Sequence, residues 1–195
     1  MNIRWKIVST YLIIIVVVLL VLSSFLLNTL YSYLFDQKKM EVLTSANIIA
    51  SIVSENFTDE YISHKLPQMP LEKNARAIVV DTESTVIYDS YKETSIKNKT
   101  FINFSITDAL LSDGKNSSNA YKENGSWFID AAVPIIKGGR TVGAVYLIQS
   151  GDSTEDVILH IRNALFILGG LIIVFVGIFS ASMASVLTLP IERFT

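Results

Sequence analysis

The chain has 195 residues and a formal net charge of −2, and it contains no cysteine. The absence of cysteine excludes a disulfide framework and a thiolate metal site. The nearly balanced, evenly spread charges do not indicate nucleic acid or an anionic membrane surface as a partner.

A charge-free run opens the chain, since residues Ile7–Phe35 include no Asp, Glu, Lys or Arg. A helix needs about 20 apolar residues to cross a bilayer, so this run is long enough to span one. A cleavable signal peptide is the alternative, but the apolar core Ile7–Leu22 exceeds a usual h-region and no cleavage site follows it. We expect an uncleaved span over residues 7–30, preceded by a cytoplasmic segment over residues 1–6.

Apolar residues continue beyond this span at helical spacing, at Val42, Ala46, Ile49, Val53 and Phe57. The pattern predicts that the span runs without a break into a long amphipathic helix ending near Phe57. Two helices with a bend near Asp36 are the alternative.

Strand patterns follow a loop that contains Pro67 and Pro70. The β-rich stretches Arg76–Asp81 and Thr85–Asp89 flank a turn, which predicts a hairpin. The polar stretch Tyr91–Asn103 is predicted to be a loop.

A short helix is predicted over residues 105–112, with Ser105 as its N-cap and Gly114 as its stop. Three more strands are predicted over residues 119–122, 126–136 and 141–149, joined by Asn-Gly and Gly-Gly turns. The longest strand alternates, with Trp127, Ile129, Ala131 and Val133 on one face and Phe128, Asp130 and Ala132 on the other. Pro134 is expected at an edge or a bulge.

The polar segment Ser153–Asp156 matches a capping box and predicts a closing helix. That helix leads into a second charge-free run, Asn163–Ile191, for which we expect a second span over residues 163–187. The predicted fold class is α+β: a five-stranded antiparallel sheet with a long N-terminal helix, between two transmembrane helices.

Basic residues set the expected orientation. Arg4 and Lys6 precede the first span, and Arg193 follows the second. Because basic flanks stay on the cytoplasmic side, both termini are expected in the cytoplasm and residues 31–161 outside the cell. The expected location is the cell membrane, with two spans.

A family resemblance supports this layout. The hairpin Ile78–Ser90 resembles the β1–β2 signature of extracytoplasmic PAS-like (single-Cache) sensor domains. The stretch Val133–Tyr146 is similar to the last hairpin of that fold, and Ala109–Leu111 lies where the family has a short crossover helix. The chain departs from the family at Ser84, where many members have Gly in the turn.

Residues 188–195 resemble the beginning of a HAMP linker, through Pro190, the aliphatic Ile191 and the bulky Phe194. A chance Pro after an apolar span is the alternative. The whole arrangement resembles the input half of a bacterial membrane sensor histidine kinase of a two-component system. Gram-positive cell-wall and phosphate sensor kinases are similar in layout.

The resemblance implies a signal-input module that detects an extracellular cue and relays it through the second span and HAMP to a cytoplasmic kinase core outside this chain. It further implies a homodimer, and a cytoplasmic response regulator as partner of the missing domains. ATP and Mg are expected only for that core, so no cofactor is expected in this chain. Alternatives are the input half of a chemoreceptor or diguanylate cyclase, and a stand-alone membrane interaction protein.

No catalytic residue and no metal site is expected. A metal site would need His64 and His160 to meet a carboxylate cluster, and nothing in their spacing suggests that they do. The resemblance implies a pocket for an extracellular small molecule or protein ligand between the sheet and its covering loop. The candidate ligand-binding residues are polar or aromatic side chains on or near predicted strands: Arg76, Lys122, Trp127, Asp130 and Arg140. Each is also typical of an ordinary sheet surface or an ion pair.

Candidate signal-relay residues lie in and after the second span. Gly170, Gly177 and Ala184 are seven residues apart, and small residues on one face let transmembrane helices approach closely. Pro190 completes this set. Small residues are common in spans, so ordinary composition is the alternative.

Overall fold

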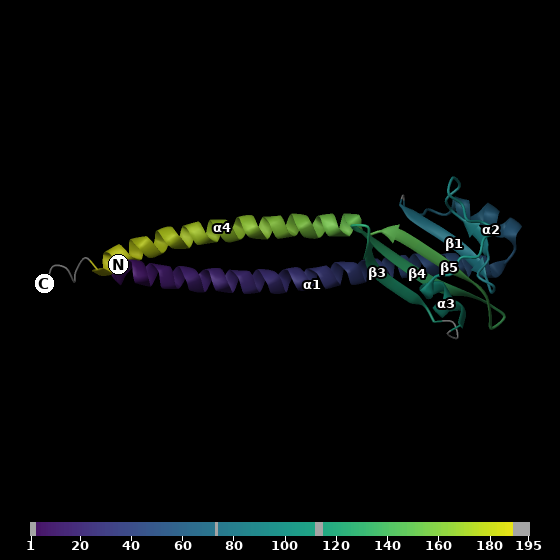
Figure 1. Cartoon of the computed structure of the whole chain (residues 1–195), viewed down its shortest axis with the longest axis horizontal. Helices are drawn as coiled ribbons and strands as arrows, with labels where there is room; N and C mark the ends of the chain where they lie inside the picture. The colour runs from purple at the N-terminus through teal and green to yellow at the C-terminus, as the bar shows by residue number, and fades with distance from the viewer. Residues whose placement is uncertain (1–2, 73, 112–114, 189–195) are drawn as a thin grey trace. The chain divides into compact units, whose positions relative to one another are not determined.

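A computed structural model describes residues 3–72, 74–111 and 115–188 of the chain (Figure 1). The chain forms two compact units. One unit, here called the folded domain, is Tyr33–Glu155. The other, here called the helical pair, combines Met1–Ser32 with Asp156–Thr195.

Helix α1 spans Ile3–Glu55 without a break, so the predicted continuous helix is confirmed. Within the folded domain it buries one stripe of side chains, each at most 2% exposed: Val42, Ala46, Ile49 and Val53. Burying one valine or isoleucine side chain contributes roughly 1.5–3 kcal/mol, so this stripe holds the helix against the sheet.

A short helix for which no prediction was made follows α1, and a 3-10 turn then overlaps the start of the predicted loop. Helix α2 spans Asp59–Lys65, and η1 spans Leu66–Gln68. The hydroxyl oxygen of Thr58 caps α2 by accepting a hydrogen bond from the Tyr61 amide at 3.4 Å. Ile62 anchors this small helix, since it is fully buried.

The sheet is antiparallel with the strand order β2-β1-β5-β4-β3. Its strands are β1 Ala75–Asp81, β2 Val86–Asp89, β3 Ser117–Glu123, β4 Ser126–Lys137 and β5 Arg140–Ser150. The predicted α+β fold with a five-stranded antiparallel sheet is therefore confirmed. Strands β3 and β5 extend beyond both of their predicted ends, whereas β4 begins at the predicted residue and extends past its predicted end only.

The turns form where the sequence predicts them. Asn124, Gly125, Gly138 and Gly139 all have positive φ, the conformation that two-residue hairpin turns of this type require. Ser84 also has a φ of 62°, which explains why glycine would suit this position.

Pro134 lies where β4 extends past β3, because the pairing of these strands ends at Ala132. A register shift follows between Ile135 and Ile136. Pro134 is thus locally at an edge and next to a bulge, as expected for a residue without an amide hydrogen.

Helix α3, Phe104–Leu111, covers one face of the sheet, and α1 lies along the other (Figure 1). Ser105 was predicted as the N-cap of α3, and this was wrong. Asn103 takes that role, since its side-chain oxygen accepts a hydrogen bond from the Ser105 amide at 2.8 Å. Ser105 is instead buried in the first turn. The predicted stop at Gly114 lies outside the described residues.

Helix α4 spans Asp152–Thr188. It begins before Ser153, so the predicted capping box at Ser153 was wrong. The Asp152 carboxylate accepts a hydrogen bond from the Trp127 amide at 2.9 Å, which ties the start of the helix to β4.

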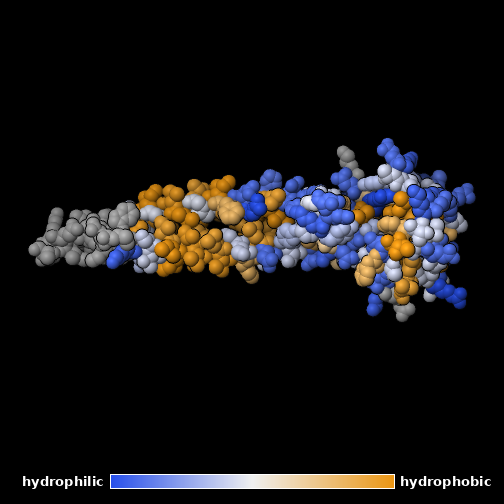
Figure 2. All heavy atoms as spheres, viewed as in Figure 1, coloured by the Kyte–Doolittle hydropathy of each residue, from blue (hydrophilic) through white to orange (hydrophobic). Residues whose placement is uncertain are grey.

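Both helices of the helical pair are long and apolar enough to cross a membrane. The most apolar stretch of each is entirely unburied, and Figure 2 shows hydrophobic residues gathered along these helices. Val21 and Phe175 are two of the large exposed side chains. Helix α1 continues past residue 30, and α4 begins before residue 163. The helix ends therefore do not mark the predicted limits of the spans, which stay predictions. Residues 189–195, which carry most of the HAMP resemblance, lie outside the described residues.

Candidate functional site

One face of the sheet carries a polar cluster inside an apolar layer. On this side, here called the α3 face, Ile78, Ala132 and Tyr146 pack against Ile106 and Ala109 of α3. All five side chains are at most 2% exposed. Polar groups inserted into such a layer need partners, because an unpaired buried polar group costs free energy.

Asp130 on β4 is the centre of the cluster and is 3% exposed. Its Oδ2 accepts hydrogen bonds from the Tyr146 hydroxyl at 3.0 Å and the Ser105 hydroxyl at 3.3 Å. Asn119 donates to the Ser105 hydroxyl oxygen at 3.0 Å, and Asn103 donates to the Tyr146 hydroxyl oxygen at 3.4 Å. The network therefore joins three strands, α3 and the loop before α3.

The second carboxylate oxygen of Asp130 stays open. Asp130 Oδ1 is buried and has no hydrogen-bond partner among the described residues. Burial and the neighbouring negative charge of Asp130 both raise the pKa of Tyr146, so the phenol stays neutral and donates. The cluster thus presents a buried acceptor that nothing in the described part of the chain fills.

Aromatic rings lie on the same face of the sheet as this acceptor. Phe101 meets the Tyr146 ring edge to face, with centroids 5.6 Å apart. Phe128, two residues before Asp130 on the same face, lies 6.0 Å from the Tyr121 ring. A few directed polar groups among aromatic walls are typical of small-molecule sites.

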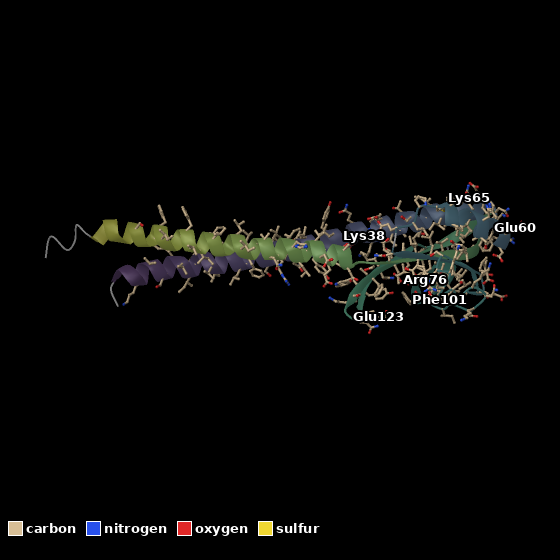
Figure 3. The ribbon with its side chains drawn as sticks, turned by 90° about the horizontal axis from the view of Figure 1, so that it is seen from above. Lys38, Glu60, Lys65, Arg76, Phe101 and Glu123 are labelled. Carbon is tan, nitrogen blue, oxygen red and sulfur yellow. The ribbon has the colours of Figure 1, made fainter. Side chains whose placement is uncertain are left out.

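The loop that precedes α3 is held by a buried ion pair. Arg76 Nε and Nη2 donate to the two carboxylate oxygens of Asp89 at 3.0 and 2.7 Å. Asp89 also accepts from the amides of Tyr91 and Ile96, and Arg76 donates to the Thr94 carbonyl oxygen. This pair fixes the start of the loop that carries Asn103, the cluster residue before α3. Figure 3 labels Arg76 and Phe101 in the folded domain.

The predicted ligand residues do not form one site. Arg76 and Asp130 share the α3 face, in one cross-strand row with Ile148 between them. Two strand spacings separate them, about 10 Å. Arg76 is also engaged by Asp89, so only Asp130 of the predicted set belongs to the polar cluster.

Lys122 and Trp127 lie on the opposite face, which packs on α1. The Trp127 ring is 4.6 Å from the Phe35 ring of α1. Lys122 pairs with Glu155 at 2.8 Å and lies 5.7 Å from the Trp127 ring. Arg140 is exposed and is the first residue of β5, directly after the Gly138-Gly139 turn. The ligand-binding role of these three residues stays a prediction.

The remaining cluster residues were not predicted from the sequence: Asn103, Ser105, Asn119 and Tyr146. Tyr146 was assigned to an alternating apolar strand, and Ser105 to a helix cap. Only the β4–β5 pairing, which sets Tyr146 opposite Ala132, brings the tyrosine beside Asp130. The sequence did offer one signal for this cluster: an Asp and a Tyr that fall on the same face of two strands predicted to pair.

Two hollows lie elsewhere in the folded domain. One, of about 210 Å³, lies between α1 and the segment before β1, and Gln149 and Glu72 line it. The other, of about 620 Å³, is bounded by η1 and the end of β2. Neither contains a buried side-chain atom that lacks a partner in the described part of the chain.

The predicted relay residues are partly described. At Gly177 an added Cβ would lie 3.8 Å from Leu12 of α1, in ordinary contact, whereas at Gly170 it would meet nothing within 4 Å. Ala184 lies in α4. Pro190 lies outside the described residues. Among the described residues, no group of acidic or histidine side chains could hold a metal ion.

No protein-family model matches the chain, and no curated protein matches it. The structure is similar to the ligand-binding domain of the Pseudomonas fluorescens chemoreceptor CtaA, solved with L-serine. That likeness has a TM-score of 0.51 and 16% identity, and covers 68% of this chain and 61% of that domain. The ligand-binding domain of the Pseudomonas aeruginosa PAO1 amino acid chemoreceptor PctC, solved with GABA, aligns with a TM-score of 0.52 and 12% identity.

The PctC likeness covers 67% of this chain and 62% of that domain. This chain therefore spans about three fifths of either chemoreceptor domain. The Escherichia coli DcuS sensor domain aligns at a TM-score of only 0.45 and 13% identity, over 66% of this chain and 98% of that one. At such identities the comparisons show fold alone: this chain has the fold of bacterial ligand-binding sensor domains.

Proposed function

We propose that the chain is the input module of a membrane signalling protein. In this proposal, Tyr33–Glu155 lies outside the cell and binds a small ligand on the α3 face. The observation that carries the proposal is the buried polar cluster with the open acceptor on Asp130. A sheet built only for stability gains from filling this layer with apolar side chains.

The fold supports this assignment, since the similar CtaA and PctC domains were solved with small molecules bound. The two apolar helices support the membrane location. Because α1 and α4 both extend from the folded domain into the apolar segments, a change in the domain moves helices that continue into the membrane. Signalling of this kind needs a coupling of only about 1–3 kcal/mol.

A thermal-unfolding screen of the full chain in lipid nanodiscs tests ligand binding. A saturating ligand stabilises the folded state by about 2.7 kcal/mol at one hundred times its dissociation constant, which raises the Tm. The effect of a true ligand should shrink in Tyr146→Phe, which removes one donor of the cluster. It should persist in Lys122→Ala, on the opposite face. Ligands that depend on Lys122 and not on Tyr146 would contradict the proposed site.

For the parent protein we propose a homodimeric sensor histidine kinase, with HAMP beginning at residues 188–195 and a response regulator as the cytoplasmic partner. The resemblance to Gram-positive cell-wall and phosphate sensor kinases supports this choice. The reading frame downstream tests it. A His followed by an acidic residue on a dimerisation helix indicates a kinase, whereas a long heptad hairpin indicates a chemoreceptor.

A further inference from the structure

The open oxygen on Asp130 restricts which ligands can complete the cluster. Oδ2 already accepts two hydroxyl donors, while Oδ1 has none, although the residue is only 3% exposed. No ion pair found among the described residues includes Asp130. A buried carboxylate without a counter-charge is unfavourable until a donor, and preferably a cation, reaches it.

The nearest arginine on this face is already engaged. The Arg76 guanidinium donates hydrogen bonds to Asp89 and to the Thr94 carbonyl oxygen, and it lies 5.1 Å from the centroid of the Tyr91 ring. A rearrangement that brought Arg76 to Asp130 would leave Asp89 buried and unpaired. The counter-charge therefore has to come from outside the described part of the chain.

Aromatic rings on the same face of the sheet also favour a cation. The rings of Phe101, Tyr121, Phe128 and Tyr146 gather on this face. The faces of aromatic rings carry negative potential and attract ammonium groups. An anionic ligand would be repelled by the carboxylate, and a neutral one would leave its charge uncompensated.

We propose that the α3-face site binds a small organic ammonium ion, whose N–H donates to Asp130 Oδ1. The inference rests on the proposed function and adds the charge of the ligand and the residue that recognises it. Ser105 links the recognition to α3, because its hydroxyl bonds the same carboxylate. Filling the site therefore acts on the first turn of α3 and on the loop before it.

The test uses the full chain in nanodiscs and propylammonium chloride as the probe. Propanol and sodium propionate serve as the neutral and anionic matches, and sodium chloride at equal ionic strength controls for salt. We expect propylammonium alone to raise the Tm beyond the salt control. Fluorescence or calorimetric titration then gives its affinity.

Asp130→Asn should weaken propylammonium binding by about 10- to 100-fold, the usual worth of a hydrogen bond to a charged group. The ligand-free Tm should not fall, because the amide oxygen can still accept from Tyr146 while the buried charge is gone. Glu123→Gln is the matched control, since it removes an exposed carboxylate at the end of β3 and should leave binding unchanged. If Asp130→Asn does not fold, Phe101→Ala provides the second test and should also weaken binding.

Any of these results would overturn the inference: a sodium chloride effect equal to that of propylammonium, undiminished binding by Asp130→Asn, unchanged binding by Phe101→Ala, or no amine response at all. Stabilisation by propanol or propionate that is lost in Tyr146→Phe would overturn the ammonium assignment. That result would leave the proposed sensor function standing. Failure of the wider ligand screen would count against the proposed function itself.

Discussion

Single side chains stabilise the α3 face and the loop beside it, and the Arg76–Asp89 ion pair is expected to contribute most. The Asp89 side chain is fully buried, while that of Arg76 is 24% exposed. Burial opposes ionisation of Asp89, but hydrogen bonds from Arg76 and from two amides outweigh it and hold the pKa of Asp89 below its usual value. The carboxylate is therefore charged whenever the domain is folded near neutral pH.

Asp89→Asn should destabilise the folded domain by about 2–3 kcal/mol, somewhat less than the loss of a fully buried pair, because Arg76 keeps some solvent. Chemical denaturation of the full chain in detergent measures this change. Asp59→Asn is the control, since Asp59 pairs with Lys97 at an exposed position and should lose less than about 1 kcal/mol. Equal losses of unfolding free energy in the two variants would mean that the buried pair stabilises the domain no more than the exposed pair does.

The Arg76–Asp89 pair should also make the unfolding free energy depend on pH in the acid range. Because the pKa of Asp89 is lower in the folded than in the unfolded chain, its ionisation stabilises the fold above the unfolded value of about 3.9. That contribution disappears as the pH falls through the lowered folded pKa. We expect unfolding free energy to drop with acid below about pH 4, and to drop less steeply in Asp89→Asn. Parallel pH profiles for the two proteins would refute this assignment.

Gly143 is a second decisive residue. An added Cβ there would collide with the Val80 carbonyl oxygen and lie 2.8 Å from the Phe57 ring. Gly143→Ala should therefore destabilise the domain by about 1–3 kcal/mol, as overpacking does. Gly169→Ala, where an added Cβ meets nothing within 4 Å, is the control. Thermal unfolding compares them, and a neutral Gly143→Ala would show that the strand can shift at no cost.

At the scale of elements, local rules predicted much of the fold. The turns at Asn124-Gly125 and Gly138-Gly139 and the stripe from Val42 to Val53 all follow from local chemistry and periodicity. Helix α2 was missed because seven polar and apolar residues before a proline give no clear period. The Ser105 cap was wrong because Asn103 is an equally good cap, and only tertiary burial distinguishes them.

The candidate site was harder to predict than the elements that build it. Asp130 could be chosen as one polar residue among five, but its partner Tyr146 depends on strand register. That register is set by the whole β4–β5 hairpin and not by either residue. The opposite placement of Trp127 follows from the alternation that the sequence did predict, so Trp127 and Asp130 could have been separated in advance.

Helix α4 is the element expected to carry the signal, because it continues from the end of β5 to Thr188. Proline inside a helix costs about 3 kcal/mol and breaks one backbone hydrogen bond. In a chimera that joins this chain to a reporter kinase, Ile158→Pro should uncouple ligand from output while export and dimerisation persist. Ile158→Ala is the control that shortens the side chain and keeps the helix. Normal signalling by Ile158→Pro would argue against a rigid helical link.

At the scale of the whole molecule, extracellular sensing requires that lipid surrounds the apolar helices and that the folded domain faces outward. The sequence supports this through two charge-free runs and basic residues at the amino end, and the exposed apolar surfaces of both helices agree. Only in that orientation can a ligand that binds on the α3 face come from outside the cell.

Because the chain has no cysteine, one introduced thiol reports its location without background. Lys115, exposed just before β3, is a suitable position in the folded domain, and Lys6 marks the amino end. In intact cells, a membrane-impermeant maleimide should label Lys115→Cys at once and Lys6→Cys only after permeabilisation. Labelling of Lys6→Cys in intact cells, with Lys115→Cys protected until the membrane is opened, would contradict the account.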